Sequence, residues 1–440
     1  MKKRVRLVFM MLTLTTLGLS GSSCTDKQET DFDWSRQASL SHEKILESIR
    51  QLEGDYTVHA RNILQGETQW NTRKNVVEEW CAGFWPGVLW YDYALSGDTT
   101  VLRAAERWTE ALHDFAYQPA YDHDLGFEMI GSYLNGYRLT GREDYRQVLL
   151  AAADTLATLF NPTVGTILSW PRHVKDYGGH NTIMDNMINL ELLLWAGQEV
   201  KSEEFRVKSE EWKEIAVRHA DTTMRYHFRE DGSSYHVAVY DTLDGHFIKG
   251  VTHQGYSDES MWARGQSWAI YGYTMMYRYT REQRFLDFAR KVTDIYLKRL
   301  HETSDDWVPL WDMDFVVDNE EMKNEGMKNE KCEDEKSVNG KSVNGKYKDV
   351  SAACVVASAL IDLSDFVGGE AGKCYYDAAI QMLQTLSEPP YWAGQTNAAL
   401  LLHSVGNYPA GSEIDASIIY ADYYYMEALN KLQTRANETR

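Results

Sequence analysis

The sequence predicts an all-α protein built as an (α/α)6 toroid, a closed ring of helical hairpins with one short β-hairpin and long loops. Apolar residues recur at spacings of three and four, as in Leu102, Ala105, Trp108 and Leu112. Glycines such as Gly97 follow the helical patterns, where they supply a left-handed C-terminal turn. Roughly a dozen helices joined by short loops suit such a ring. An open helical solenoid and two helical bundles are the alternatives, although no fixed-period repeat favours the solenoid.

The predicted elements follow these patterns in chain order. Helices are predicted at 41–63, 81–96, 100–117, 125–139, 145–159, 182–199, 203–226, 257–279, 282–300, 351–367, 372–386, 397–402 and 416–432. Residues 234–240 alternate between polar and apolar side chains and can pair with 245–251 as a short hairpin.

The first residues predict export. A basic start at Lys2, Lys3 and Arg4 precedes an apolar run over 7–19 that is too short to span a bilayer comfortably. Small residues then lead to Cys24, so residues 1–24 are interpreted as a lipoprotein signal peptide with Cys24 as a lipid anchor. The protein would be periplasmic or anchored to the bacterial envelope, and an ordinary cleaved signal peptide is the alternative.

The rest of the chain is predicted to form a polar tether at 25–39 and a single (α/α)6 domain at 40–440. One segment, 318–348, is charged and contains the duplicated run Lys-Ser-Val-Asn-Gly. Such a composition buries too little apolar area to offset its ordering entropy, so we interpret it as a low-complexity insertion.

Composition limits the possible functions. The formal net charge of −20 argues against nucleic-acid binding, which needs a basic surface. The 14 Trp and 27 Tyr mildly favour a carbohydrate protein, because aromatic rings stack on sugars. The five cysteines show no metal-ligand spacing, so we expect no metal, no cofactor and no disulfide framework. A monomer or homodimer is expected.

Three stretches could carry chemistry. Asp124 stands before a helical pattern, where it could be a catalytic carboxylate or simply an N-cap. Asp185 falls in a largely apolar helix that Asn181 could cap, and a buried carboxylate there must be hydrogen-bonded or used. Arg264 lies between Trp262 and Trp268, where it could grip a carboxylate or pack as a structural residue.

Together these stretches resemble glycoside hydrolase family 88, the unsaturated glucuronyl hydrolases. The matching pieces run in order along most of the chain: 80–85, 123–127, 184–186, 250–255, 262–268, 349–353 and 411–424. The insertion before Asp349 departs from the family, which usually has a short loop there.

The resemblance implies a catalytic (α/α)6 domain that needs no metal and removes the unsaturated uronic acid that polysaccharide lyases leave at a non-reducing end. By resemblance, Asp185 is the general acid and base and Asp124 assists it. The resemblance also implies a substrate pocket lined by Trp80, His123, Trp170, His236, Gln254, Trp262, Arg264 and Trp268.

The chemistry favours a pair of carboxyls with separated titrations. We expect the pKa of Asp185 to lie high and Asp124 to stay ionised, because coupled carboxylates pull their titrations apart. Two other functions stay open: an unsaturated rhamnogalacturonyl hydrolase, and a non-catalytic surface sugar-binding lipoprotein.

Overall fold

The computed structural model describes residues 32–52, 54–200, 206–315 and 347–438, all within one compact unit, Phe32–Arg440. The predicted signal at 1–24 and nearly all of the insertion at 318–348 lie outside the described residues.

The unit is mostly helical. Its inner helices are α2 (Phe84–Ser96), the run α4 (Leu125–Met129), π-helical turn η2 (Ile130–Leu134) and α5 (Asn135–Thr140), then α8 (Asn186–Glu199), α10 (Ala263–Thr280), α13 (Val350–Val367) and α15 (Ile419–Glu438). Its outer helices are α1 (Trp34–Leu52), α3 (Thr99–Glu110), α6 (Glu143–Ala157), α9 (Arg206–Tyr226), α11 (Gln283–Thr303) and α14 (Gly369–Leu386). Short helical turns complete the set: η1 (His113–Tyr117), η3 (Pro171–His173) and α7 (Val174–Tyr177).

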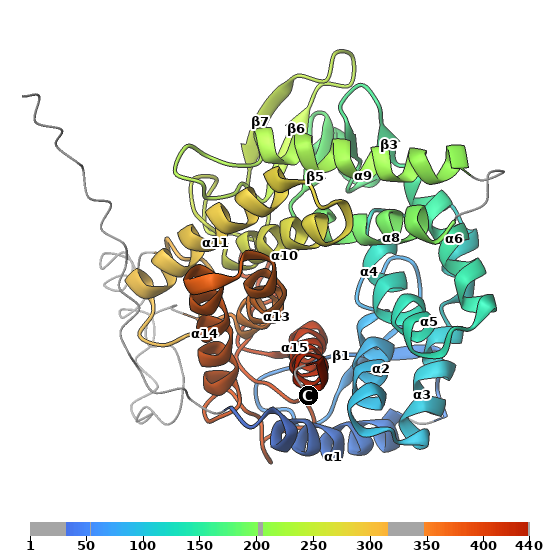
Figure 1. Ribbon diagram of the computed structural model, residues 1–440, viewed down its shortest axis with the longest axis vertical. Helices are drawn as coiled ribbons and strands as arrows, with labels where there is room; N and C mark the ends of the chain where they lie inside the picture. The colour runs from blue at the N-terminus through green and yellow to red at the C-terminus, as the bar shows by residue number, and fades with distance from the viewer. Residues whose placement is uncertain (1–31, 53, 201–205, 316–346, 439–440) are drawn as a thin grey trace, which may run out of the picture. The chain divides into compact units, whose positions relative to one another are not determined.

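The inner helices form a closed ring. Each packs on the next in the order α2, η2, α8, α10, α13 and α15, and α15 packs back on α2 (Figure 1). Each outer helix lies against an inner one, as in the pairs α2 with α3, α8 with α9, α10 with α11 and α13 with α14. The predicted (α/α)6 toroid is therefore confirmed.

Burial explains which helices lie inside. The outer helix α3 buries one stripe, Val101, Ala105 and Trp108 among it, as an amphipathic helix does. The inner helix α13 is apolar on nearly all sides and is long enough to span a bilayer, yet 78% of it is buried in the unit. We therefore interpret α13 as a core helix.

Short strands connect the helices. The hairpin predicted at 234–240 and 245–251 is confirmed as β6 (Val237–Tyr240) and β7 (Phe247–Val251). A third strand, β5 (His180–Ile183), pairs with β6 to complete an antiparallel sheet. A second sheet joins β2 (Asn71–Lys74), β1 (Val58–Ile63) and β8 (Ser417–Ile418), and a two-stranded pair joins β3 (Phe160–Asn161) and β4 (Thr166–Ile167).

Several predicted boundaries are wrong. The tether at 25–39 was predicted too long, because α1 begins at Trp34 and already buries Gln37 and Ala38. The helix predicted at 41–63 ends at Leu52, and its last residues form β1. Residues 397–402 form bends and an isolated β-bridge at Leu401 instead of a helix.

Two further expectations are also corrected. Asn181 does not cap a helix, because it lies in β5 and α8 begins only at Asn186. Cys374 takes part in a disulfide, whereas Cys81 and Cys354 are free thiols. The sequence spacing could not show this bridge because spacing alone does not determine which cysteines meet in space.

A buried polar network ties the inner helices together. Glu427 on α15 accepts hydrogen bonds from Tyr91 on α2, at 3.0 Å, and from Tyr271 on α10, at 2.8 Å. It also accepts one from Ser358 on α13. Glu191 on α8 continues the network with two arginines, so that every inner segment of the ring takes part.

The two arginines control the charge of Glu191. Arg138 on α5 lies 2.7 Å from its carboxylate and Arg278 on α10 lies 3.0 Å away. Burial raises the pKa of Glu191, but Arg278 and Arg138 outweigh that effect and bring the pKa to about 2. Removing one charge of a buried group of ions leaves the others uncompensated.

We predict that Glu191→Gln lowers the free energy of unfolding near pH 7 by about 3 kcal/mol. A depressed carboxyl pKa adds stability above the unfolded value of 4.5, and that stability is lost as the pH falls towards about 2. Urea unfolding at a series of pH values should therefore show that the difference in free energy of unfolding between parent and variant becomes smaller in acid. Glu302→Gln, at an exposed pair with Lys298, is the control and should change little. A gap that is constant with pH would contradict the account.

Candidate active site

One edge of the three-stranded sheet gathers residues from distant parts of the chain. Asp185 follows β5, His236 precedes β6 and Gln254 follows β7. The end of β5 pairs with the start of β6, which also pairs with the end of β7. The backbone N–H of Met184 donates to the carbonyl of His236 at 3.0 Å, which fixes this edge. The antiparallel register therefore brings the three functional side chains together.

Asp185 faces a histidine whose tautomer is fixed. Nε2 of His236 lies 3.4 Å from Oδ2 of Asp185. Nδ1 of the same ring accepts a hydrogen bond from the backbone N–H of Gln254 at 3.2 Å. An accepting ring nitrogen carries no proton, so the ring proton sits on Nε2 and points to Asp185. Among the described residues, neither of the facing atoms has a well-aligned hydrogen-bond partner, which leaves both available to a substrate or water.

Asp124 faces a second histidine in the same way. Nε2 of His123 lies 3.5 Å from Oδ1 of Asp124, and Nδ1 of His123 accepts from the side-chain amide of Asn189 at 2.8 Å. Burial lowers the pKa of His123 to about 4, so this ring is neutral near pH 7. The site thus contains two matched histidine–aspartate pairs.

Neither aspartate acts as a helix cap. Asp124 and Asp185 stand at the N-cap positions of α4 and α8, but their carboxylates accept no capping hydrogen bond. Instead, the backbone N–H of Asp124 donates to Asp122 at 2.9 Å, and Asp122 also binds Arg172 at 2.8 Å. The interpretation of Asp124 as a simple cap is therefore wrong.

The two aspartates titrate in the opposite order to the one expected from the sequence. Burial, together with the negative charges of Asp122 and Asp185, raises the pKa of Asp124 well above its ordinary value. Burial also raises the pKa of Asp185, but the neighbouring His236 outweighs that effect and the pKa falls below its ordinary value. The reason is local: each carboxyl faces a histidine, but Asp124 also has the carboxylate of Asp122 beside it.

The guanidinium of Arg264 is committed to the protein. It is 2% exposed and donates to Asp349 at 2.6 Å and to the carbonyls of Val405 and Gly406 at 2.5 Å each. A weaker bond of 3.3 Å reaches Oε1 of Gln254. The expectation of a free arginine gripping the substrate directly is thus corrected: Arg264 contacts the site through Gln254.

The predicted aromatic residues divide into two groups. Trp262 packs on His236 with ring centres 4.3 Å apart, and Trp170 lies 4.9 Å from the ring of His253 and 6.1 Å from that of His236. Trp80 is half-buried and lies 5.0 Å from Tyr420. Trp170 and Trp262 thus lie beside a histidine of the site, whereas Trp80 packs on Phe127, near Asp124 in the chain.

Trp268 differs from the other tryptophans. It is 0% exposed and packs on Phe127 and Tyr424 in the core. Its predicted place on the pocket wall is therefore wrong. The family resemblance had implied a wall position for Trp268, but α10 directs its side chain towards Phe127 and Tyr424.

Sequence reasoning missed three supporting residues. Asn181 donates to the carbonyl of Trp170 at 3.0 Å and accepts from its N–H at 2.9 Å, so it anchors that tryptophan. Asn189 orients His123, and Asp349 holds Arg264. Asp349 lies in a stretch that the resemblance singled out, whereas Asn181 and Asn189 lie on either side of the matched piece at 184–186. Only the spatial partners of these three residues reveal what they do.

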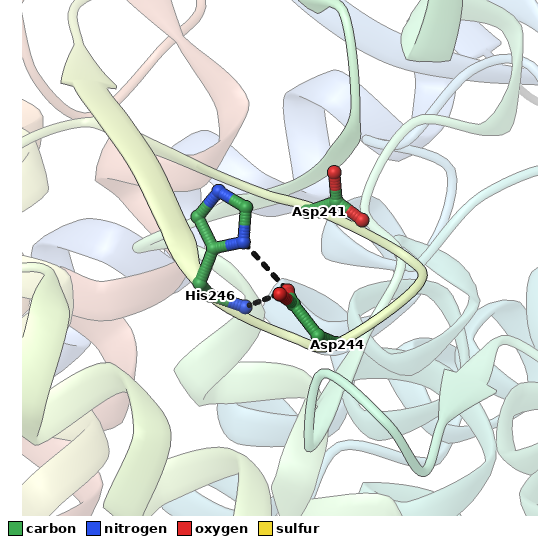
Figure 2. A group of neighbouring side chains, drawn as sticks. All are labelled: Asp241, Asp244 and His246. Atoms are coloured by element: carbon green, nitrogen blue, oxygen red, sulfur yellow. Dashed lines mark hydrogen bonds and ion pairs between the residues drawn. The ribbon is translucent and has the colours of Figure 1, made fainter.

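One group could hold a cation among the described residues. Asp241, Asp244 and His246 gather at the tip of the β6–β7 hairpin (Figure 2). Their polar atoms already build the turn: Asp241 accepts from the N–H of Leu243 at 2.7 Å, and Asp244 accepts from the ring of His246 at 2.6 Å. We therefore interpret this exposed group as turn structure.

Comparison with known proteins identifies the family. No family model matches the chain. An unsaturated glucuronyl hydrolase of Formosa agariphila is 35% identical over 97% of this chain and 98% of its own length. The chain belongs to glycoside hydrolase family 88, the unsaturated glucuronyl hydrolases. An unsaturated chondroitin disaccharide hydrolase of Streptococcus pyogenes is 32% identical over 80% of each chain.

The solved structures agree. The crystal structure of an unsaturated glucuronyl hydrolase specific for heparin superposes with a TM-score of 0.77 and 36% identity, over 92% of this chain and 98% of that one. The chain is thus a glycoside hydrolase that removes the unsaturated uronic acid from oligosaccharides. The alternatives of a rhamnogalacturonyl hydrolase and a non-catalytic sugar-binding protein are set aside.

The close approach of helix α4 to helix α8 depends on Gly126. A Cβ added there would lie 2.6 Å from Cα of Asn189, closer than atoms can pack. We predict that Gly126→Ala pushes the two helices apart, lowers the free energy of unfolding by about 1–3 kcal/mol and lowers kcat. Gly136→Ala is the control, because it creates a similar overlap with Trp90 and Tyr145 on the same helical run. Equal losses of kcat in the two variants, measured beside thermal unfolding, would remove Gly126 from its assigned role.

Proposed function

We propose that Asp185 delivers a proton to the substrate and then deprotonates a water, with Asp124 as its partner. The substrate's double bond, between carbons 4 and 5, is a vinyl ether. A proton added at carbon 4 leaves positive charge at carbon 5, where the ring oxygen stabilises it. Water adds there, the product hemiketal opens, and the glycosidic bond is lost. One carboxyl can serve both proton transfers in turn.

The two carboxyls act as a unit that holds one proton. In the free enzyme the proton is favoured on Asp124, because that pKa is raised while the pKa of Asp185 is lowered. A bound uronate brings another negative charge, which favours protonation of the carboxyl nearest to it. We propose that this charge moves the proton to Asp185 and so prepares the general acid.

Local donors meet the substrate's charge in this acidic protein. Oε1 of Gln254 accepts from Arg264 at 3.3 Å, which leaves the amide N–H groups of Gln254 for the substrate's carboxylate. The half-buried Gln254 lies beside His236, next to Asp185. We propose that Gln254 binds the carboxylate and that Arg264, through Gln254, supplies the favourable field.

The aromatic residues fit a sugar site. Trp80, Trp170 and Trp262 contribute rings around the histidine–aspartate pairs, where a sugar ring can stack. The names of the relatives support disaccharides made by glycosaminoglycan lyases as substrates, of the chondroitin or the heparin kind.

We also propose that the protein is exported and carries a lipid on Cys24. The basic start, the short apolar run and the small residues before Cys24 support this. The tether that remains after processing is shorter than 25–39, because α1 begins at Trp34. A monomer or homodimer is proposed.

The assignment of Asp185 predicts loss of catalysis without loss of binding. Asp185→Asn keeps the side chain's shape but cannot transfer a proton, so we expect kcat to fall at least about 1,000-fold. The assay follows the ultraviolet absorbance of the double bond in a lyase-made unsaturated disaccharide. Asp244→Asn is the matched control at the exposed hairpin tip, and it should keep parental activity, with or without a chelator. A folded Asp185→Asn enzyme with near-parental kcat would overturn the assignment.

The shared proton predicts a shift in pH dependence. The last proton of the parent pair leaves at the raised pKa of Asp124, so this group sets the basic limb of the kcat/KM profile. In Asp124→Asn the only remaining carboxyl is Asp185, which holds its proton only at lower pH. The basic limb should therefore move to lower pH in the variant. A basic limb that stays in place would show that the two carboxyls do not share a proton.

A further inference from the structure

The helices that carry the two aspartates meet at Asn189. This residue lies one turn into α8, four positions after Asp185, and it is fully buried. Gly126, in the first turn of α4, packs directly over it, since a Cβ at Gly126 would overlap the backbone of Asn189. Only a glycine lets α4 approach closely enough for Asn189 to reach the residue before Asp124.

The contact made by Asn189 is a directed hydrogen bond. Its amide nitrogen, Nδ2, lies 2.8 Å from Nδ1 of His123. An amide nitrogen can only donate, so Nδ1 of His123 must accept and cannot carry the ring proton. The proton is left on Nε2, which lies 3.5 Å from Oδ1 of Asp124.

We propose that Asn189 is a positioning residue that fixes the tautomer of His123, so that an N–H of His123 always faces Asp124. With that donor at Oδ1, the proton of Asp124 is directed to its other oxygen, Oδ2. This inference rests on the proposed function, in which Asp124 shares a proton with Asp185.

The second pair in the site supports this interpretation. His236 has the same arrangement, with Nδ1 accepting and Nε2 facing Asp185, but its donor is the backbone N–H of Gln254. Two different donors thus produce the same tautomer at both aspartates. An asparagine that served packing alone would not have to donate to Nδ1 of His123, as the backbone N–H of Gln254 donates to Nδ1 of His236.

Burial makes the choice of tautomer strict. Both Asn189 and His123 are 0% exposed, so water cannot supply the missing donor if the amide is removed. The opposite tautomer would place two N–H groups against each other, at Nδ1 of His123 and Nδ2 of Asn189.

The direct test is nitrogen NMR of the parent enzyme with 15N-labelled histidines, in which the His123→Gln variant assigns the His123 signals. We expect the Nε2–H tautomer at neutral pH, because Nδ1 accepts from Asn189. A dominant Nδ1–H tautomer, or an even mixture, in an enzyme that still consumes the unsaturated disaccharide would overturn the inference but leave the proposed function intact.

A variant tests the effect on catalysis. Asn189→Asp is nearly isosteric but presents an acceptor, which should draw the ring proton to Nδ1 of His123. We expect kcat to fall at least about 10-fold and KM to change less, with a shifted basic limb of the kcat/KM profile.

Asn135→Asp is the matched control, because Asn135 is a buried asparagine on the inner helix α5 that donates to Tyr423 and to no histidine. Its pH limbs should stay in place. An Asn189→Asp enzyme with parental kcat and pH limbs would contradict the inference, and if that variant does not fold, the parent spectrum decides alone.

Discussion

The site depends on a single electrostatic constraint: two carboxyls in a buried, poorly solvated site cannot both be charged without a large cost. The barrel does not relieve this by exposing them or by pairing them with free cations. A histidine faces each carboxyl, but Asp124 also has the carboxylate of Asp122 beside it, which separates their titrations. Arg264, which lowers the pKa of Asp185, is held by Asp349 and backbone carbonyls, so it acts at a distance.

Two separate parts of the fold support this arrangement. At one end, a short three-stranded sheet aligns Asp185, His236 and Gln254 through its register. Elsewhere, Glu191 and Glu427 connect all the inner segments and hold the ring closed. Stability and catalysis therefore use separate sets of buried charges. The histidines add direction, because Asn189 and the backbone N–H of Gln254 bind their Nδ1 atoms and leave the Nε2 atoms facing the aspartates.

Helical periodicity made the ring predictable. An outer helix such as α3 buries one stripe of apolar side chains, and that three- and four-residue spacing is visible in the sequence. The motifs around Asp124 and Asp185 also singled out two residues that the structure places in similar histidine–aspartate pairs. The three-stranded sheet was only partly predictable, because β5 is buried on both sides and reads like the start of a helix. The order of the pKa values could not be predicted, since it depends on which side chains from distant segments face each carboxyl. The same holds for Trp268 and Arg264, whose types fit a pocket but whose surroundings make them core and support residues.

The central claim is that the free enzyme carries its one shared proton on Asp124. Infrared difference spectroscopy tests it directly, because a neutral carboxyl has a C=O stretching band that a carboxylate lacks. At neutral pH, the parent-minus-variant spectrum should show such a band for Asp124→Asn and none for Asp185→Asn. Other buried carboxyls with raised pKa, such as Glu128, occur in all three proteins and cancel. A band that is lost in Asp185→Asn and kept in Asp124→Asn would contradict the account.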